Sequence, residues 1–364
     1  YKYNKENMKR INNLFVDEKL TVNLCRMAIL ESSSGKRHRR DVQKIMNNID
    51  YYAEQLQNML LDMTFQPSKY GYETKIEYGK KRNLQKPKFY PDQCVHHVMI
   101  MLIRDKSLKR IDPHAIASVD KRGAIMGIKC LKYWIQKRNK RETTYCGKGD
   151  IRHCFDSITP EVAYSTFTSF IKDVKYLEIM RRIIFSFTSL PLGNYISGWV
   201  LNLLLKRFDD NIRACDGVTH YLRYMDDFVF FSSNRRKAKK VREVAIAELD
   251  KIGLKLKENY QLFKVDDRGV DMLGYRFFRN YSILRKRNLK KILRSAKNIN
   301  KRHDYSPHNC MSFMSRLGQA KHCSSKYVFK HVGKQVNLQR AKDVIRDYFR
   351  KKAEGHELFI SKNS

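Results

Sequence analysis

The chain is 364 residues long and 42% hydrophobic, and its 74 Lys and Arg against 37 Asp and Glu give a formal net charge of +37. Such an excess predicts a polyanionic partner, since a domain with an isoelectric point above about 9 is typical of nucleic-acid binding. A membrane surface is disfavoured, because no stretch approaches the ~18–20 apolar residues of a spanning helix and no signal peptide is visible. We therefore expect a cytoplasmic protein that binds nucleic acid and has no membrane partner.

The N-terminal segment, residues 1–69, is expected to be a helical extension with a break at Ser32–Gly35. A basic cluster follows the break and opens the next helix. It is either a solvated helix end or a contact for a nucleic-acid template, and the sequence leaves both interpretations open. The candidate nucleic-acid-binding residues of this cluster are Lys36, Arg37, Arg39 and Arg40.

Two strands are predicted next. Within residues 70–92, β-prone side chains recur at every second position, which predicts a strand, and a basic turn over Gly79–Arg82 follows it. A further strand is predicted over residues 143–151 and ends at Asp150. A helix starts soon afterwards, because Thr159 precedes Pro160 and an acid comes next.

The most informative motif is YMDD, Tyr224–Asp227, which lies between Leu222 and the apolar run Phe228–Phe231. This pattern predicts a strand–turn–strand hairpin with both carboxylates on the tight turn. Adjacent like charges have no structural purpose there, whereas a hard divalent cation would make them favourable. With Asp150 as a third carboxylate, they could hold two Mg²⁺ ions about 3.5–4 Å apart, as in in-line phosphoryl displacement. Taken alone, the motif could also be a chance surface turn.

The rest of the chain is predicted to be largely helical. An amphipathic helix over residues 235–252 should end at Gly253. A basic amphipathic helix is expected over residues 284–301, with an apolar face for packing and cations that follow a phosphate backbone. A merely soluble helix face is the alternative. The candidate nucleic-acid contacts on this helix are Lys290, Arg294 and Lys297.

The eight cysteines form no CxxC pair and are expected to be reduced thiols. A zinc site is a disfavoured alternative, because the spacing of its residues matches no standard zinc pattern. Those residues would be His308, Cys310, His322 and Cys323.

The order of these motifs resembles that of bacterial reverse transcriptases over roughly residues 30–335. DIRHCFDSI at 150–158 is similar to the first palm motif of the family, and SLPLGNYISGWVLNLLL at 189–205 resembles the loop and helix that back the nascent base pair. YMDD resembles the palm hairpin, and MLGYR at 272–276 resembles the segment that grips the primer end. Within the family, the chain most resembles the enzymes of diversity-generating retroelements, through SSSGKRHRR at 32–40, GLKLKENYQLF at 253–263 and RLGQAKHCSS at 316–325.

The resemblance implies catalytic roles. Asp150, Asp226 and Asp227 would hold two catalytic Mg²⁺ ions, with the Ile151 carbonyl as a further ligand and with Mn²⁺ as an acceptable substitute. Phe155 would be the steric gate that excludes a 2′-OH, and ordinary core packing is the alternative for this ring.

The resemblance also implies binding roles for several residues around the reaction. Gly193 would let the backbone approach the templating base. The triphosphate would be held by Lys81, Arg82, Lys121 and Arg122. Tyr224, Gly274 and Tyr275 would contact nucleic acid.

The chain departs from the family pattern at several positions. Diversity-generating enzymes usually end the nascent-base-pair block with Ser-Gln, whereas this chain has Gly198 after its serine. Val119 stands where relatives place an arginine in the second fingers block. The usual lysine near Tyr260 is missing, so that Lys257 and Lys264 are both candidates for the general acid that protonates pyrophosphate.

The expectation from sequence is an α+β protein with the right-hand polymerase architecture of fingers, palm with an antiparallel sheet, and helical thumb. Its expected parts are the extension at 1–69, fingers and the start of the palm at 70–149, palm at 150–280 with a fingers segment at 160–190, thumb at 281–350 and a tail at 351–364.

The expected function is RNA-directed DNA synthesis from a template RNA, through an RNA–DNA duplex and deoxynucleoside triphosphates, in a diversity-generating retroelement with a small basic accessory protein. An antiphage defence reverse transcriptase and a non-catalytic RNA-binding scaffold are the alternatives.

Overall fold

The computed structural model describes the backbone of residues 10–77 and 80–361, and their side chains except those of 75–83 and 352–361. The chain forms two compact units. Unit one contains the chain up to Gly123 together with Gly147–Phe230 and Arg235–Leu262. Unit two contains Ala124–Cys146, Phe231–Asn234 and the chain from Phe263 onward.

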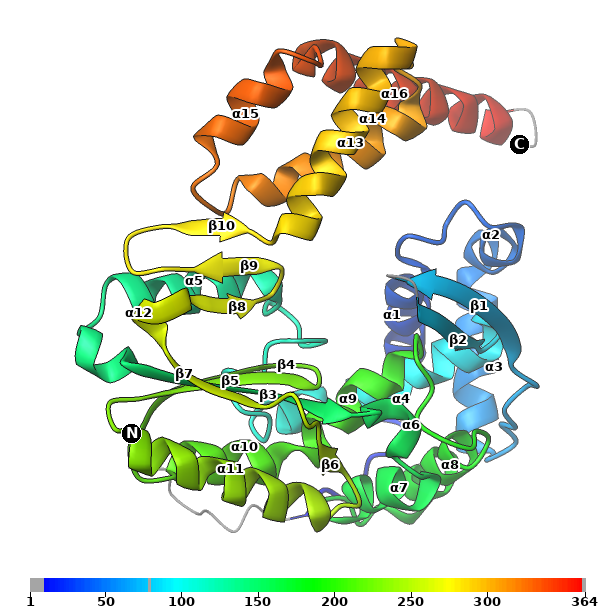
Figure 1. Cartoon of the computed structure of the whole chain (residues 1–364). Helices are drawn as coiled ribbons and strands as arrows, with labels where there is room; N and C mark the ends of the chain where they lie inside the picture. Colours follow the sequence, from blue (N-terminus) through cyan, green and yellow to red (C-terminus); the bar gives the residue numbers. More distant parts are fainter. Residues whose placement is uncertain (1–9, 78–79, 362–364) are drawn as a thin grey trace. The chain divides into compact units, whose positions relative to one another are not determined.

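The N-terminal part of unit one is helical, as the sequence predicts. Its helices are α1 (Val22–Ser33), α2 (Arg40–Asn47), α3 (Ile49–Leu61) and α4 (Cys94–Leu108). Helix α1 packs against α3 and α4 (Figure 1). It begins where the Thr21 hydroxyl accepts a hydrogen bond from the Leu24 N–H at 3.1 Å, which satisfies one of the unpaired donors of the first turn.

A β-hairpin lies between α3 and α4. Strand β1 (Gly71–Glu77) pairs antiparallel with β2 (Lys80–Lys86), and Glu77 is opposite Lys80. The predicted strand is therefore confirmed, but the prediction of a turn over Gly79–Arg82 is wrong, because residues from Lys80 onward already pair in β2. A short π-helical turn (Phe89–Gln93) then leads into α4.

The carboxylate motifs lie on a five-stranded sheet of order β4-β5-β3-β6, in which β7 also pairs with β3. The strands are β3 (Tyr145–Arg152), β4 (Val218–Tyr224), β5 (Asp227–Ser232), β6 (Lys255–Leu256) and β7 (Gln261–Lys264). A Cβ atom at Gly149 would lie 2.5 Å from the Phe228 ring, so the glycine lets this ring cross the neighbouring strand. The YMDD hairpin and the strand ending near Asp150 are both confirmed.

Helices cover this sheet and its loops. They are α6 (Cys154–Ser157), α7 (Pro160–Thr168), α8 (Val174–Ile184), α9 (Tyr195–Leu204), α10 (Lys206–Ala214) and α11 (Arg235–Asp250). Helices α10 and α11 pack together on one face of the sheet (Figure 1). Helix α9 is almost entirely buried and contacts α4, α7 and α10, so it forms the centre of unit one.

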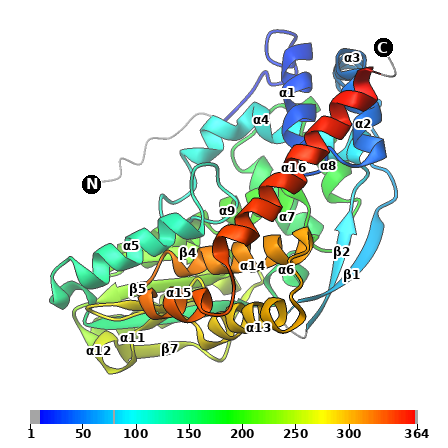
Figure 2. The same ribbon diagram turned by 90° about the horizontal axis from the view of Figure 1, so that it is seen from above.

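Unit two combines a small sheet with a helical bundle. Its elements are α5 (Ala124–Gln136), a 3₁₀ turn (Lys140–Thr143), α12 (Val265–Arg268), β8 (Val270–Met272), β9 (Tyr275–Phe277), β10 (Ser282–Leu284), α13 (Lys286–Arg302), α14 (Pro307–Ala320), α15 (Lys326–Gly333) and α16 (Leu338–Ser361). The strand order is β10-β9-β8, all antiparallel. Helix α14 packs against both α13 and α16, as Figure 2 shows from above.

The architecture agrees with the α+β class expected from the sequence, because helices surround antiparallel sheets in both units. In the described part of the chain, no helix combines the length and apolar character needed to cross a membrane.

Candidate active site

The three predicted metal carboxylates belong to adjacent parts of one sheet in unit one. Asp150 lies near the end of β3, Asp226 is in the β4–β5 turn and Asp227 opens β5. The Ile151 N–H donates to the Asp226 carbonyl oxygen at 3.2 Å, which connects the two acidic segments directly. All three aspartates are half-buried, so their carboxylates are partly shielded from water yet accessible to a ligand.

A lysine stands beside this carboxylate group. The Lys257 Nζ atom lies 3.0 Å from Asp150 Oδ2, and the Lys257 N–H donates to the Asp150 carbonyl at 2.9 Å. The pKa of Lys257 is raised, first by its hydrogen bond to Asp150 and then by the charges of Asp150, Asp226 and Asp227. Of the two lysines that the sequence left open, Lys257 is therefore the one that lies at the carboxylates.

The donor set fits a divalent cation. Carboxylate oxygens are hard donors that Mg²⁺ prefers, and the Lys257 ammonium shows that this edge of the sheet already attracts positive charge. Among the residues that the structure describes, no three His, Cys, Asp or Glu side chains are preassembled as a metal site. This finding covers Asp150, Asp226 and Asp227 as well as the residues of the disfavoured zinc alternative, namely His308, Cys310, His322 and Cys323.

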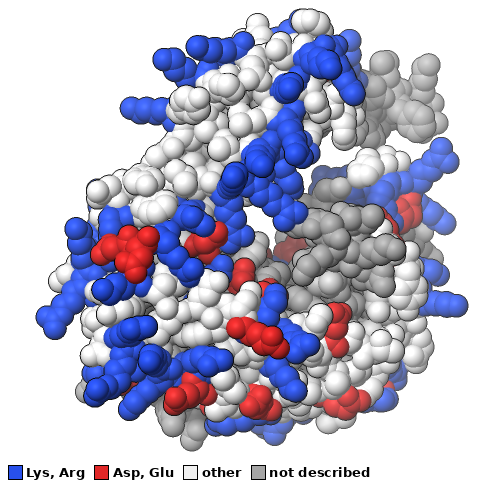
Figure 3. Space-filling view, viewed as in Figure 1, with Lys and Arg blue, Asp and Glu red and all other residues white. Residues whose placement is uncertain are grey.

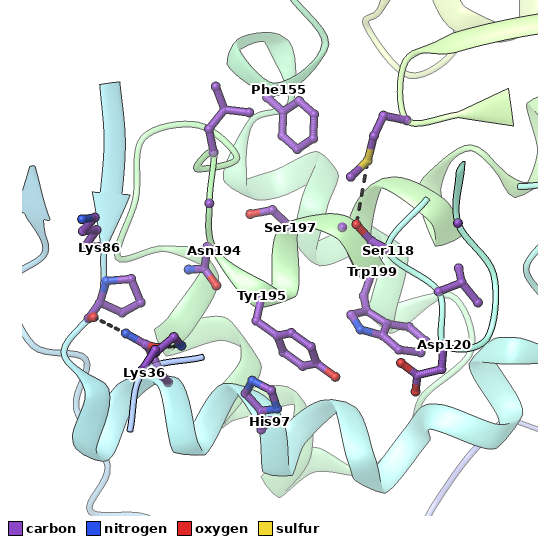
Figure 4. A pocket seen from close by; sticks show the side chains of 18 of the residues that line it. Lys36, Lys86, His97, Ser118, Asp120, Phe155, Asn194, Tyr195, Ser197 and Trp199 are labelled. Carbon is purple, nitrogen blue, oxygen red and sulfur yellow. Dashed lines mark hydrogen bonds between the residues drawn. The ribbon is translucent and has the colours of Figure 1, made fainter. Parts of the chain in front are cut away.

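A cavity of about 750 Å³ in unit one lies next to the YMDD turn and is large enough for a nucleotide (Figure 4). Met225 of the turn, Phe155 of α6 and Gly193 all line it. The structure thus gathers the predicted steric gate, the predicted glycine contact and the YMDD turn around one space. Asn194, Tyr195 and Trp199 of the block at 189–205 also line the cavity, as do His97 and Ser118, which the sequence reasoning did not assign to the site.

The floor of the cavity is aromatic and rigid. The rings of His97 and Tyr195 stack with centroids 3.7 Å apart and an interplanar angle of 8° (Figure 4). Arg104 donates to both carboxylate oxygens of Glu31, at 2.9 and 2.6 Å, and to the Tyr195 hydroxyl at 3.2 Å. Burial lowers the pKa of His97 to about 4, so the stacked ring is neutral at neutral pH.

Cations lie at one side of the cavity. Lys36, Arg39 and Lys86 line it, and the Lys36 ammonium donates to the Ser32 carbonyl at 3.0 Å and to Gln93. Burial, followed by the charge of Arg39, lowers the pKa of Lys36. A space with an aromatic floor and a cationic side suits a base and the phosphate attached to it.

The structure describes two of the four predicted triphosphate contacts, Lys121 and Arg122, with their side chains. The side chains of Lys81 and Arg82 lie outside the described residues. Lys121 is exposed and has a left-handed backbone (φ 60°). The Arg122 guanidinium lines the cavity but donates to the carbonyls of Asp112 and Ala115 at 2.6 and 3.1 Å.

The remaining predicted nucleic-acid contacts are surface residues or structural ones. Arg37 and Arg40 are exposed and do not line the cavity, and Tyr224 is half-buried at the end of β4. In unit two, Gly274 has a φ of 85°, and the Tyr275 hydroxyl donates to the Gln319 carbonyl at 2.8 Å.

The predicted basic helix has a cationic face. Lys290 and Arg294 line a groove on α13 together with Lys286, Arg287 and Lys291, and Lys297 is exposed on the same helix. Figure 3 shows the band of Lys and Arg side chains that this helix carries. Ile292, Ala296 and Ile299 are buried on the opposite face, so the amphipathic pattern read from the sequence is confirmed.

Comparison with known proteins identifies the family. The family described as "Reverse transcriptase (RNA-dependent DNA polymerase)" matches residues 80–277, more than half of the chain. This match confirms the reverse transcriptase resemblance and, with it, the right-hand polymerase fold expected from the sequence. No curated protein matches the chain.

Solved structures similar to the chain include apo telomerase from Candida tropicalis, with 13% identity and a TM-score of 0.44 over 74% of this chain and 60% of that chain. A form of the same telomerase truncated from its C-terminal domain has 14% identity and a TM-score of 0.41 over 64% of this chain and 58% of that chain. The chain thus spans about three fifths of the length of these telomerase chains.

Proposed function

The chain belongs to the reverse transcriptase family, and from its site we propose that it is an RNA-directed DNA polymerase that extends a primer along a template RNA. The observation that carries the proposal is the placement of Asp150, Asp226 and Asp227 on one sheet, beside a cavity of nucleotide size that Phe155 and Gly193 line. A non-catalytic RNA-binding scaffold would have no need of three carboxylates on one sheet near this cavity.

The carboxylates of Asp150, Asp226 and Asp227 would hold the metal, with the Ile151 carbonyl as a further ligand. When bound, two Mg²⁺ ions, or Mn²⁺ in their place, would activate the primer 3′-OH and neutralise the leaving pyrophosphate. The Lys257 ammonium, held beside Asp150, would give its proton to that pyrophosphate.

The walls of the cavity would select and orient the incoming nucleotide. The Phe155 ring would occupy the space of a 2′-OH and so favour deoxynucleotides. Gly193 has a φ of 88°, a conformation that glycine adopts readily, and it would let the backbone approach the templating base. Lys81, Arg82, Lys121 and Arg122 are the proposed contacts for the triphosphate.

The template and the RNA–DNA duplex would be bound mainly through phosphates. Lys36, Arg37, Arg39 and Arg40 would contact the template strand. The α13 cations Lys290, Arg294 and Lys297 would follow the duplex backbone. Gly274 and Tyr275 would contact the primer end, and Tyr224 would contact nucleic acid. Because such contacts release counterions, they would act on every sequence alike.

The proposed biological role is cDNA synthesis in a diversity-generating retroelement, in the cytoplasm and with a small basic accessory protein. The sequence motifs quoted above support this role, and the Gly198 departure keeps antiphage defence as the second candidate. A variable-protein gene and template repeat beside the coding sequence would favour the first role, and their absence together with protection against phage would favour the second.

Primer extension on an RNA template with Mg²⁺ tests the proposed activity. We expect DNA synthesis by the native protein and a loss of about 10³-fold or more in Asp226→Asn and Asp150→Asn, with RNA binding nearly unchanged. Asp156→Asn is the matched control, because it removes an exposed carboxylate from the segment that follows Asp150. Near-normal synthesis by either triad variant would refute the assignment.

A further inference from the structure

Two residues of the cavity wall have left-handed backbones. Met225, in the catalytic turn, has a φ of 56°, and Ser118, in the loop that follows α4, has a φ of 53°. Non-glycine residues rarely adopt this conformation, and when they do, surrounding contacts hold them there. Both residues line the nucleotide cavity, and the Ser118 Oγ atom lies 4.0 Å from the Met225 Sδ atom (Figure 4).

A buried arginine holds the first of these residues. Arg223 precedes the YMDD turn by one residue, and its side chain is fully buried. Its Nη1 atom donates to the Met225 carbonyl at 3.0 Å and to Asn202 Oδ1 at 3.1 Å. Its Nε and Nη2 atoms donate to the two oxygens of Asp209, each at 2.7 Å. The guanidinium thus binds Asp209 through one edge and the backbone of the YMDD turn through the other.

The same network holds the second residue. The Asn202 Nδ2 atom donates to the carbonyl of Ala117, directly before Ser118, at 2.8 Å. The backbone of Arg223 binds this loop as well, because its N–H donates to the His114 carbonyl and its carbonyl accepts from the Ile116 N–H, both at 3.0 Å. One cluster therefore fixes the turn and the loop relative to each other.

Gly198 adds a steric condition. A Cβ atom at this position would lie 2.6 Å from the Ser118 Cβ atom, closer than real contacts allow. The absence of a side chain at Gly198 therefore leaves the room that the Ser118 loop fills. The Ser118 loop can occupy this position only because residue 198 is a glycine.

Stability alone explains this cluster poorly. A fully buried ion pair usually contributes little net stability, because the desolvation of both charges offsets their attraction. Here the pair has a further partner in the Tyr221 hydroxyl, which donates to Asp209 Oδ1 at 2.5 Å. The cluster holds two strained segments in place, and both segments face the same cavity.

We propose that Arg223, with Asn202, is a positioning residue for polymerisation, which sets the Met225 and Ser118 walls of the nucleotide cavity relative to the catalytic aspartates. Neither side chain lines the cavity, so both act through the backbone segments they hold. The inference rests on the proposed polymerase activity. A displacement of the turn by about 1 Å would slow the chemical step on the order of 10²-fold, because in-line attack depends on alignment.

The test is pre-steady-state single-nucleotide incorporation by the full chain on a primed RNA template. The burst amplitude reports the fraction of correctly folded enzyme, and the burst rate constant reports alignment. Arg223→Lys keeps the charge but loses the planar fork, and Asn202→Leu leaves the Arg223–Asp209 pair intact. We expect the rate constant to fall about 10- to 100-fold in both variants while the amplitude and the template affinity stay near native values.

Arg182→Lys is the matched control. Arg182 belongs to the same unit and donates to the carbonyls of Met63 and Phe65 at 2.6 and 3.0 Å, but it does not line the cavity. It should change thermal stability and leave the rate constant unaltered. A native rate constant with a reduced amplitude in both test variants, or failure of both to fold, would show a purely structural role and overturn the inference. An inactive native protein would instead refute the proposed function itself.

Discussion

The cavity of unit one and the basic face of α13 in unit two are proposed to bind their ligands by different physical means. The cavity has an aromatic floor, a neutral histidine and backbone segments held by a buried polar cluster. The α13 face consists of exposed cations on a helix whose other side is packed. The first arrangement depends on positions within an ångström, whereas the second depends on charge that salt can screen. Variants in the two regions should therefore fail in different ways.

Of the variants that compare these two regions, the one with the largest expected effect changes the charged face. Replacing Lys290, Arg294 and Lys297 together by Ala should flatten the log–log dependence of duplex affinity on salt by about two to three units and weaken binding on the order of 100-fold at low salt. Single-nucleotide addition at saturating template should survive, because the cavity is untouched. Fluorescence anisotropy with a labelled RNA–DNA duplex over a salt series measures the slope.

The control for this variant is a triple Ala replacement of Arg236, Lys239 and Lys240, which are exposed cations on α11 of unit one. It removes the same charge from another surface. If both triple variants change the slope equally, only the overall charge matters and the α13 face has no special role.

The next effect concerns the cavity wall. Phe155→Val should increase ribonucleotide incorporation relative to deoxynucleotide incorporation about 10- to 100-fold, because the smaller side chain no longer fills the space of the 2′-OH. Competition between the two nucleotides in a primer-extension assay measures this ratio. Phe155→Tyr keeps the bulk and should retain the native ratio. An unchanged ratio in Phe155→Val would mean that the ring serves packing alone.

The smallest effect is on stability and should be confined to unit one. Burial lowers the pKa of His96 to about 3 and that of His97 to about 4. Folding thus favours the neutral rings, so their contribution is complete above the ordinary pKa near 6.5 and declines as the pH falls from there toward 4. Hydrogen exchange, corrected for intrinsic rates, should show α4 losing protection between pH 7 and pH 5 more than α14 does. Equal losses in both helices would contradict this expectation.

Some of this behaviour could be read from local sequence because it depends on local physics. The YMDD hairpin follows from β-prone residues on either side of a tight turn, and the α13 amphipathic face follows from helical spacing. The start of α7 at Pro160 follows from its threonine cap. The predicted turn at Gly79–Arg82 was wrong because pairing between the two strands, which is not a local property, outweighed the local turn signal.

The sequence by itself determined the family, the carboxylates, the α+β class and the basic helix, because each is carried by residues close together or by a recognisable order of motifs. Only the tertiary structure decided which residues join Phe155 and Gly193 around the cavity. His97 and Tyr195 stack although they are far apart in the chain, and Lys257 reaches Asp150 across the β3–β6 pair. Arg223 is indistinguishable by sequence from any other cation, and only burial among Asp209, Asn202 and the Met225 carbonyl gives it a role. Contacts between residues distant in the chain determine which charged side chains become buried, and a local sequence pattern does not contain this information.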